Sequence, residues 1–218
     1  MRATAQHPTC AVLLLATACA APSARPRPAP PPAPATPAPP GARRSSPRSA
    51  GLSIATHERY YDVTGANVAE LRDAIRRLGP EEQGQSADAL TVWDLEWTYG
   101  ERPGAGACTL RDVRVTLSVT MTLPRWDAPA DAPARLIAAW REYLDHVKLH
   151  EAGHRAIAEQ YAHRLLAALT ELRAATCDAV WDAASRTAAR VNAEGQARNR
   201  AYDVETKNGQ TQGVVLEP

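Results

Sequence analysis

The residues with the clearest chemical potential form the short run His150-Glu151-Ala152-Gly153-His154. This is an HExxH motif, in which the two histidines stand one helical turn apart on the same face of a helix. Both imidazoles can then bind one Zn²⁺ ion at about 2.0–2.1 Å. Glu151 follows the first ligand, so it can take a proton from a water molecule at the metal while the metal polarises a scissile carbonyl. The pattern indicates metal-assisted amide hydrolysis with water as the nucleophile.

A third histidine, His146, lies four residues before the motif. All three cannot bind one ion, because a straight helix separates His146 from His154 by about 12 Å. Only the pair His150 and His154 brackets a glutamate, so we expect His146 to be a solvated residue or an outer hydrogen-bond donor. The alternative for the whole motif is a pair of solvent-facing histidines that interact with Glu151 on a polar helix face.

A third metal ligand must come from a later part of the chain. Glu171 lies on the same expected helix, about 26 Å beyond His154, so it is excluded unless the helix bends. The sequence alone does not choose among the carboxylates that follow, which are Asp178, Asp182, Glu194, Asp203 and Glu205.

Alternating apolar and polar residues predict strands upstream of the motif. Residues 113–123 alternate strictly between apolar side chains and Arg, Thr or Ser, which is typical of a strand with one solvated face. Residues 91–99 alternate in the same way, residues 100–106 are expected to interrupt that strand, and residues 59–63 form a short β-prone start. We expect a small antiparallel sheet.

Apolar residues at three- and four-residue steps predict helices. One covers residues 67–78, and a long one runs from about residue 132 to 175 with the HExxH motif near its middle. Residues 177–200 continue helically, and the tail from Tyr202 is expected to be irregular. The fold class is therefore α+β, with a small antiparallel sheet followed by two long helices, the first carrying HExxH.

The first 50 residues differ from the rest of the 218-residue chain. Ala11–Ala20 has the length of a signal-peptide apolar region, and the small residues before Cys19 look like a bacterial lipobox. We expect a signal peptide over residues 1–19 and a lipid on Cys19. The alternative is cleavage after Ala20, giving a soluble secreted protein. Residues 20–50 hold eleven of the 18 prolines and predict an extended tether before a domain over residues 51–218.

Net charge and cysteine content limit the partners and the kinds of metal site that the chain can have. A formal net charge of +1 argues against a strongly basic nucleic-acid surface, so no nucleic-acid partner is expected. Two cysteines follow the processed segment, Cys108 and Cys177, and in an exported protein an even number favours one disulfide. A cysteine-ligated metal site would need more cysteines at closer spacing.

Several ordered blocks resemble the domain of unknown function 922 family, described as predicted secreted zinc-dependent peptidases. They include YYDVTG at 60–65, TVWDLEWTY at 91–99, HEAGH at 150–154 and AYDVETKNGQTQG at 201–213. The resemblance implies His150 and His154 as Zn²⁺ ligands, Glu151 as the general base, a Cys108–Cys177 bridge and a location in the bacterial cell envelope.

The resemblance also indicates a third ligand. In the block YD-x-x-T-x-x-G-x-x-x-G, Asp203 occupies the acidic position and is our choice. Relatives often carry His before the first Gly of this block, where this chain has Asn208. If that His completes the site elsewhere, Asn208 would weaken metal binding here.

Two hypotheses follow for function. The first is an envelope zinc peptidase that acts on a peptide or protein substrate and is secreted or held to a membrane through lipidated Cys19. The second is a non-catalytic envelope lipoprotein or scaffold that retains the fold, motivated by Asn208 and by the long tether. Metal content and peptide cleavage distinguish the two.

Overall fold

The structure is a computed structural model of the chain and describes residues 50–82 and 84–217. The expected signal peptide over residues 1–19, the lipobox at Cys19 and the tether up to residue 49 lie outside the described residues. In chain order the described elements are β1 (Gly51–Asp62), α1 (Val68–Leu78), β2 (Glu81–Glu82), β3 (Gln85–Ser86), β4 (Leu90–Gly104), β5 (Ala107–Arg125), α2 (Ala134–Thr170), β6 (Arg173–Ala174), α3 (Cys177–Thr206) and the 3₁₀ turn η1 (Gln210–Gln212).

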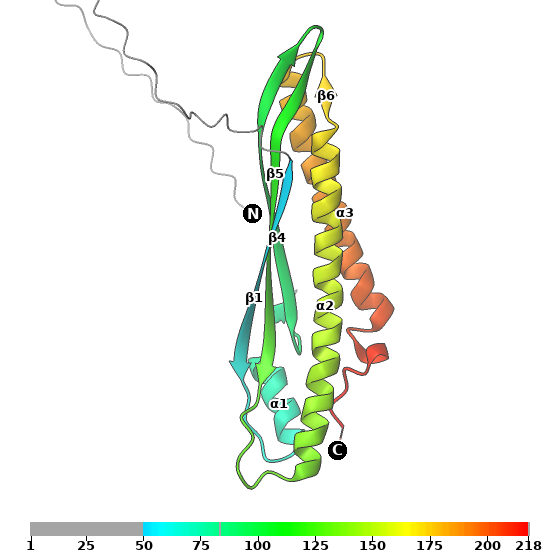
Figure 1. The fold of residues 1–218 in the computed structure, drawn as a ribbon. Coiled ribbons are helices and arrows are strands. Elements are labelled where there is room, and N and C mark those ends of the chain that lie inside the picture. The colour runs from blue at the N-terminus through cyan, green and yellow to red at the C-terminus, as the bar shows by residue number, and fades with distance from the viewer. Residues whose placement is uncertain (1–49, 83, 218) are drawn as a thin grey trace, which may run out of the picture. The chain divides into compact units, whose positions relative to one another are not determined.

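The main sheet has the strand order β1-β5-β4, and β6 pairs with the start of β5 (Figure 1). β4 and β5 are antiparallel and form one long hairpin. β1 runs parallel to β5 along its whole length, from Gly51 opposite Arg114 to Asp62 opposite Arg125. Parallel pairing is possible because the chain between β1 and β5 includes α1 and β4, which is long enough for the crossover. The sheet is therefore mixed, and the expectation of a purely antiparallel sheet is wrong.

Two strands extend beyond the ranges expected from the sequence. β1 begins at Gly51 rather than near Arg59, and most of its residues are exposed, so its edge position requires no apolar alternation. β4 continues to Gly104 instead of stopping at Gly100, because a register shift between Thr98 and Gly100 absorbs the irregularity. A β-bulge of this kind bends a strand without ending its pairing.

The two long helices are present, and the α+β class is confirmed. α2 has 37 residues and lies along the sheet, while α3 has 30 residues and returns antiparallel beside α2 (Figure 1). α3 ends at Thr206, so the chain after Tyr202 is helical for another turn and then forms the η1 turn. The tail is thus more regular than expected from its composition.

α1 is held at both ends by local sequence. The Asn67 side chain accepts a hydrogen bond from the Glu70 amide at 3.0 Å, and the Glu70 carboxylate accepts one from the Ala66 amide at 2.8 Å. These bonds satisfy the Glu70 amide in the first helical turn and the Ala66 amide just before the helix. Gly79 ends the helix where a side chain would lie 2.3 Å from the Ala87 carbonyl oxygen. The cap and the stop fix α1 beside the first half of α2.

The core consists of two apolar clusters that meet on α2. The larger cluster fills the space between the apolar face of β5 and the helices from Ile157 of α2 onwards. The smaller one joins α1, the first half of α2 up to Val147, and Leu216 from the C-terminal segment. Between Val147 and Ile157, the buried residues of α2 are His150, Glu151 and His154. The HExxH motif therefore lies at the junction of the two clusters.

The disulfide between Cys108 and Cys177 is present and confirms that prediction. It joins β5 to the first residue of α3, close to the short β5–β6 pairing at Cys108 and Thr109.

None of the helices in the described part of the chain combines the length and apolar character that a membrane span requires.

Candidate metal centre

The two histidines and the glutamate of the HExxH motif are all buried on α2. His150, Glu151 and His154 are 6%, 3% and 5% exposed, respectively. The two imidazoles approach through their Nε2 atoms, which lie 3.2 Å apart. The histidines therefore face inward toward one point, unlike the solvent-facing pair that was the alternative for this motif.

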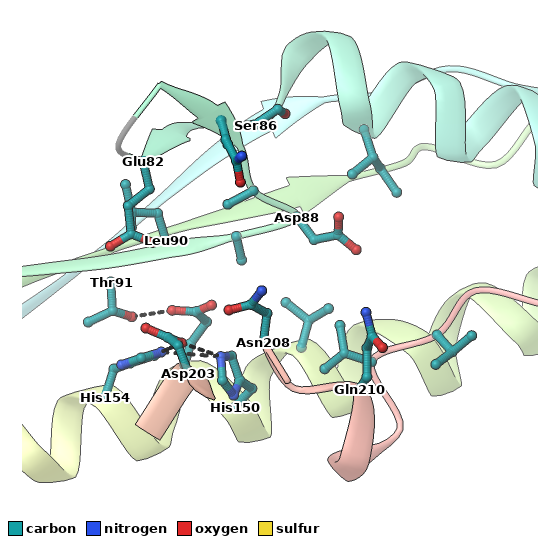
Figure 2. A pocket seen from close by; sticks show the side chains of 18 of the residues that line it. Glu82, Ser86, Asp88, Leu90, Thr91, His150, His154, Asp203, Asn208 and Gln210 are labelled. Atoms are coloured by element: carbon teal, nitrogen blue, oxygen red, sulfur yellow. Dashed lines mark hydrogen bonds and ion pairs between the residues drawn. The ribbon is translucent and has the colours of Figure 1, made fainter. Parts of the chain in front are cut away.

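Asp203 reaches the same point from α3 (Figure 2). Its Oδ1 atom lies 2.9 Å from His154 Nε2 and 3.3 Å from His150 Nε2. The antiparallel packing of α2 and α3 brings position 203 opposite the motif. Among the described residues, His150, His154 and Asp203 form a cluster whose ligand atoms all lie within 4.8 Å of one another and could hold a metal ion.

Three of the other carboxylates considered for this role lie in different surroundings. Glu194 pairs with Arg164 and Arg190, and Glu205 pairs with Arg198. Glu171 caps the end of α2, well beyond the motif. The structure thus brings together His150, His154 and Asp203, the three ligands named from the sequence.

Each histidine is held by a carboxamide at its second ring nitrogen. His150 Nδ1 lies 2.9 Å from Gln212 Oε1, and His154 Nδ1 lies 2.9 Å from Asn199 Oδ1. A carboxamide oxygen accepts hydrogen bonds, so each Nδ1 carries the proton that it donates. In the neutral form of each ring, the Nε2 lone pair is then left for a metal ion.

Glu151 is held by Thr91, the second residue of β4. The Thr91 hydroxyl donates a hydrogen bond of 2.6 Å to Glu151 Oε2. Burial raises the pKa of Glu151, and this effect exceeds the lowering by the Thr91 hydrogen bond and by the two histidines. A buried carboxylate with a raised pKa is better suited to accept a proton near neutral pH than an exposed one.

The charges of Asp203 and His154 stabilise each other. Burial alone would raise the pKa of Asp203, but hydrogen bonds and charge interactions with the two histidines lower it to about 2. Burial alone would lower the pKa of His154, yet the interactions with Asp203, followed by those with Asn199 and Glu151, leave it raised. Asp203 therefore stays ionised and supplies negative charge to the centre.

Tyr202 packs between the two histidine rings and the glycine of the motif. Its ring is stacked on His150 with centroids 5.1 Å apart, and it meets His154 edge-on at 4.9 Å. A Cβ atom at Gly153 would lie 2.1 Å from the Tyr202 hydroxyl oxygen. Gly153 is therefore required in the middle of α2, because any larger side chain at this position would collide with the Tyr202 phenol.

We expect Gly153→Ala to lower the free energy of unfolding by about 1–3 kcal/mol, the usual cost of overpacking a filled site. In an unobstructed helix the same change would raise stability by about 1 kcal/mol, so the sign is informative. Chemical denaturation of the variant measures the effect. In a Tyr202→Ala background the Gly153→Ala change should cost nothing, and a Gly153→Ala protein as stable as the parent would contradict the close contact.

The cluster opens into a cleft of about 780 Å³. One wall is formed by α1 and by the segment from Glu82 to Thr91, and the other by the motif, the end of α3 and the chain from Asn208 to Glu217. Asn208 lines this cleft near Asp203 (Figure 2). It lies beside the three-residue cluster, and its left-handed backbone, with φ of 52°, follows a similar conformation at Lys207.

His146 does not join the cluster. Its Nδ1 atom lies 2.8 Å from the Gly213 carbonyl oxygen, so it holds the segment after η1 against α2. His146 therefore donates to the backbone and not to a residue of the metal cluster. A Cβ atom at Gly213 would lie 2.5 Å from the same Nδ1, which explains the glycine at that position.

Sequence reasoning missed four residues that hold the centre, namely Thr91, Asn199, Tyr202 and Gln212. Thr91 carried one usable signal, because it shares the alternation of Trp93 and Leu95 and so points to the buried side of β4. Asn199 lies four residues before Asp203, one helical turn away. Gln212 had no such signal, because its position depends on the turn η1.

The comparisons with known proteins give one match. A family model described as "Bacterial protein of unknown function (DUF922)" matches residues 58–210. No curated protein and no solved structure matches the chain. The matched range includes the motif, Asp203 and most of the residues that line the cleft.

Proposed function

The chain belongs to the DUF922 family of bacterial proteins, and we propose that it is a zinc-dependent peptidase. The observation that carries the proposal is the convergence of His150 Nε2, His154 Nε2 and Asp203 Oδ1 beside the buried carboxylate of Glu151. Two histidines and one carboxylate, with a further position open to a cleft, form the ligand set typical of catalytic zinc.

The spacing of the three atoms supports a zinc ion. Ligands about 2.0–2.1 Å from a tetrahedral metal are about 3.3 Å from one another. The three separations here are 2.9, 3.2 and 3.3 Å. When bound, zinc would supply Lewis acidity toward a substrate carbonyl and toward water.

The chain's own residues would provide the proton transfer and the orientation. Glu151 follows His150 directly, and its buried carboxylate would accept the proton of the attacking water and return it to the leaving amine. The Thr91 hydroxyl holds one carboxylate oxygen of Glu151, which leaves the other oxygen for this task. Glu151 is therefore the general base of the proposed reaction.

The cleft supports a peptide substrate. Besides the histidines, its lining includes Asp88, Leu90 and Ile75 of α1. The volume of about 780 Å³ falls in the range of sites that enclose several ligand groups. Both polar and apolar side chains line its walls, so it can contact the backbone and the side chains of a peptide. The proposed substrate is thus a peptide or an exposed protein segment.

We place this activity in the bacterial cell envelope. The support comes from the sequence before the described residues, where an apolar run precedes Cys19 and a Pro-rich segment follows. Lipid on Cys19 would tether the domain to a membrane. The Cys108–Cys177 bridge agrees with this location, because disulfides persist in oxidising compartments.

Metal analysis of the purified chain, together with peptide hydrolysis, tests the proposal. We expect about one zinc ion per chain, loss of hydrolysis when a chelator removes it, and recovery when zinc is added back. Zinc binding should also raise the unfolding temperature, which gives a readout independent of the chosen substrate. A chain that binds no zinc from a zinc-replete buffer would contradict the proposal.

A further inference from the structure

We infer that Asn199 and Gln212 are positioning residues that fix the two metal-binding histidines without adding negative charge to the centre. The inference rests on the proposed zinc site. It assigns a role to two neutral side chains at positions where a carboxylate would have the same shape and reach. It also predicts that a carboxylate introduced at either position changes metal affinity in a defined direction.

The contact to His154 is buried and comes from the helix that supplies Asp203. Asn199 is 8% exposed, and its Oδ1 accepts the Nδ1 proton of His154 at 2.9 Å. Positions 199 and 203 are one helical turn apart on α3. One helix face therefore supplies both the third ligand and the group that orients the second histidine.

The contact to His150 depends on a small network in the C-terminal segment. Gln212 Oε1 accepts from His150 Nδ1 at 2.9 Å, while Gln212 Nε2 donates to the Tyr202 hydroxyl at 3.0 Å. The backbone amide of Gln212 donates to the Gly209 carbonyl at 2.8 Å, which holds the turn η1. With its nitrogen on Tyr202, the carboxamide presents its oxygen to the histidine.

The charge of the two groups matters because the centre already contains Asp203 and Glu151. A carboxylate behind a metal-binding histidine draws the Nδ1 proton toward itself and makes the imidazole a stronger donor to the metal. A carboxamide gives the same orientation with a weaker effect. Histidines held by this neutral pair would therefore bind zinc less tightly than histidines held by carboxylates. The zinc ion would remain a stronger Lewis acid.

The test compares zinc affinities of the full chain, measured by competition with a chromophoric chelator. Gln212→Ala should weaken zinc binding about 10–100-fold, the usual cost of removing such a partner. Gln212→Glu should bind zinc about tenfold more tightly than the parent and, at saturating zinc, hydrolyse peptide more slowly. A gain in affinity cannot arise from structural damage, so this variant separates positioning from folding.

Gln160→Glu is the matched control, because it makes the same chemical change at an exposed position of α2 that does not line the cleft. Its added charge should change zinc affinity by less than about threefold, since exposed charges are screened. Asn199→Asp provides a second variant at the buried histidine and should also tighten zinc binding. If the parent binds zinc but Gln212→Ala binds equally well, or Gln212→Glu matches Gln160→Glu, the inference is overturned while the proposed function stands. If the parent chain binds no zinc, both the inference and the proposed function are contradicted.

Discussion

Replacing Glu151 with Gln should lower the rate of peptide hydrolysis by about 10²–10⁴-fold, the usual contribution of a general base. Gln keeps the shape of the side chain and can still accept the Thr91 hydrogen bond seen at 2.6 Å, but its oxygen cannot take up a proton at neutral pH. His150, His154 and Asp203 remain, so zinc content should be unchanged. In this variant the rate of hydrolysis should therefore fall while the bound zinc per chain stays constant.

A matched control is Glu142→Gln, which makes the same chemical change on an exposed position of α2. It should leave both the rate and the zinc content at parental levels. Thermal unfolding of Glu151→Gln should show no loss of stability, because burial disfavours the charged form that the substitution removes. Full activity in Glu151→Gln would show that hydrolysis, if present, uses another base.

Replacing Asp203 with Ala should weaken zinc binding by more than about 100-fold, beyond the usual cost of losing an outer hydrogen-bond partner. The substitution removes the Oδ1 atom that lies 2.9 Å and 3.3 Å from the two histidine nitrogens. Two imidazoles on one helix then remain, which is too few protein ligands for a stable zinc site. Hydrolysis at limiting zinc should fall with the metal content.

Glu205→Ala is the appropriate control, because this carboxylate lies on the same helix two residues later and pairs with Arg198. It was an equal candidate on spacing alone. It should keep zinc and activity, while Asp203→Ala loses both. The reverse outcome would mean that α3 binds the metal in a different rotation about its axis.

Much of the fold follows from patterns that the sequence displays openly. Residues 113–123 of β5 alternate strictly, because one face packs on the helices while the other is solvated, and this pattern predicts a strand. β1 lacks that pattern because an edge strand buries little, so its true extent and its parallel pairing could not be inferred. Pairing direction depends on where the chain between two strands travels, which local residues do not encode.

The candidate site divides in the same way. His150, Glu151 and His154 are four residues or fewer apart, so helical geometry alone brings them together. Asp203 required the resemblance to a family, because its approach depends on the packing of α3 against α2. Gln212 depends on left-handed backbone at Gly209 and on the turn that follows. Contacts formed by tertiary packing leave no periodic trace in the sequence.

The disulfide has a consequence for the centre at the other end of α3. Asp203 lies 26 positions after Cys177 on one unbroken helix, a distance of about 39 Å along the axis. A slip of α3 by a single residue would move Asp203 about 1.5 Å and rotate it by about 100° away from the histidines. The disulfide attaches the first residue of α3 to β5 and so opposes such a slip. It thereby helps to keep Asp203 aligned with the two histidines.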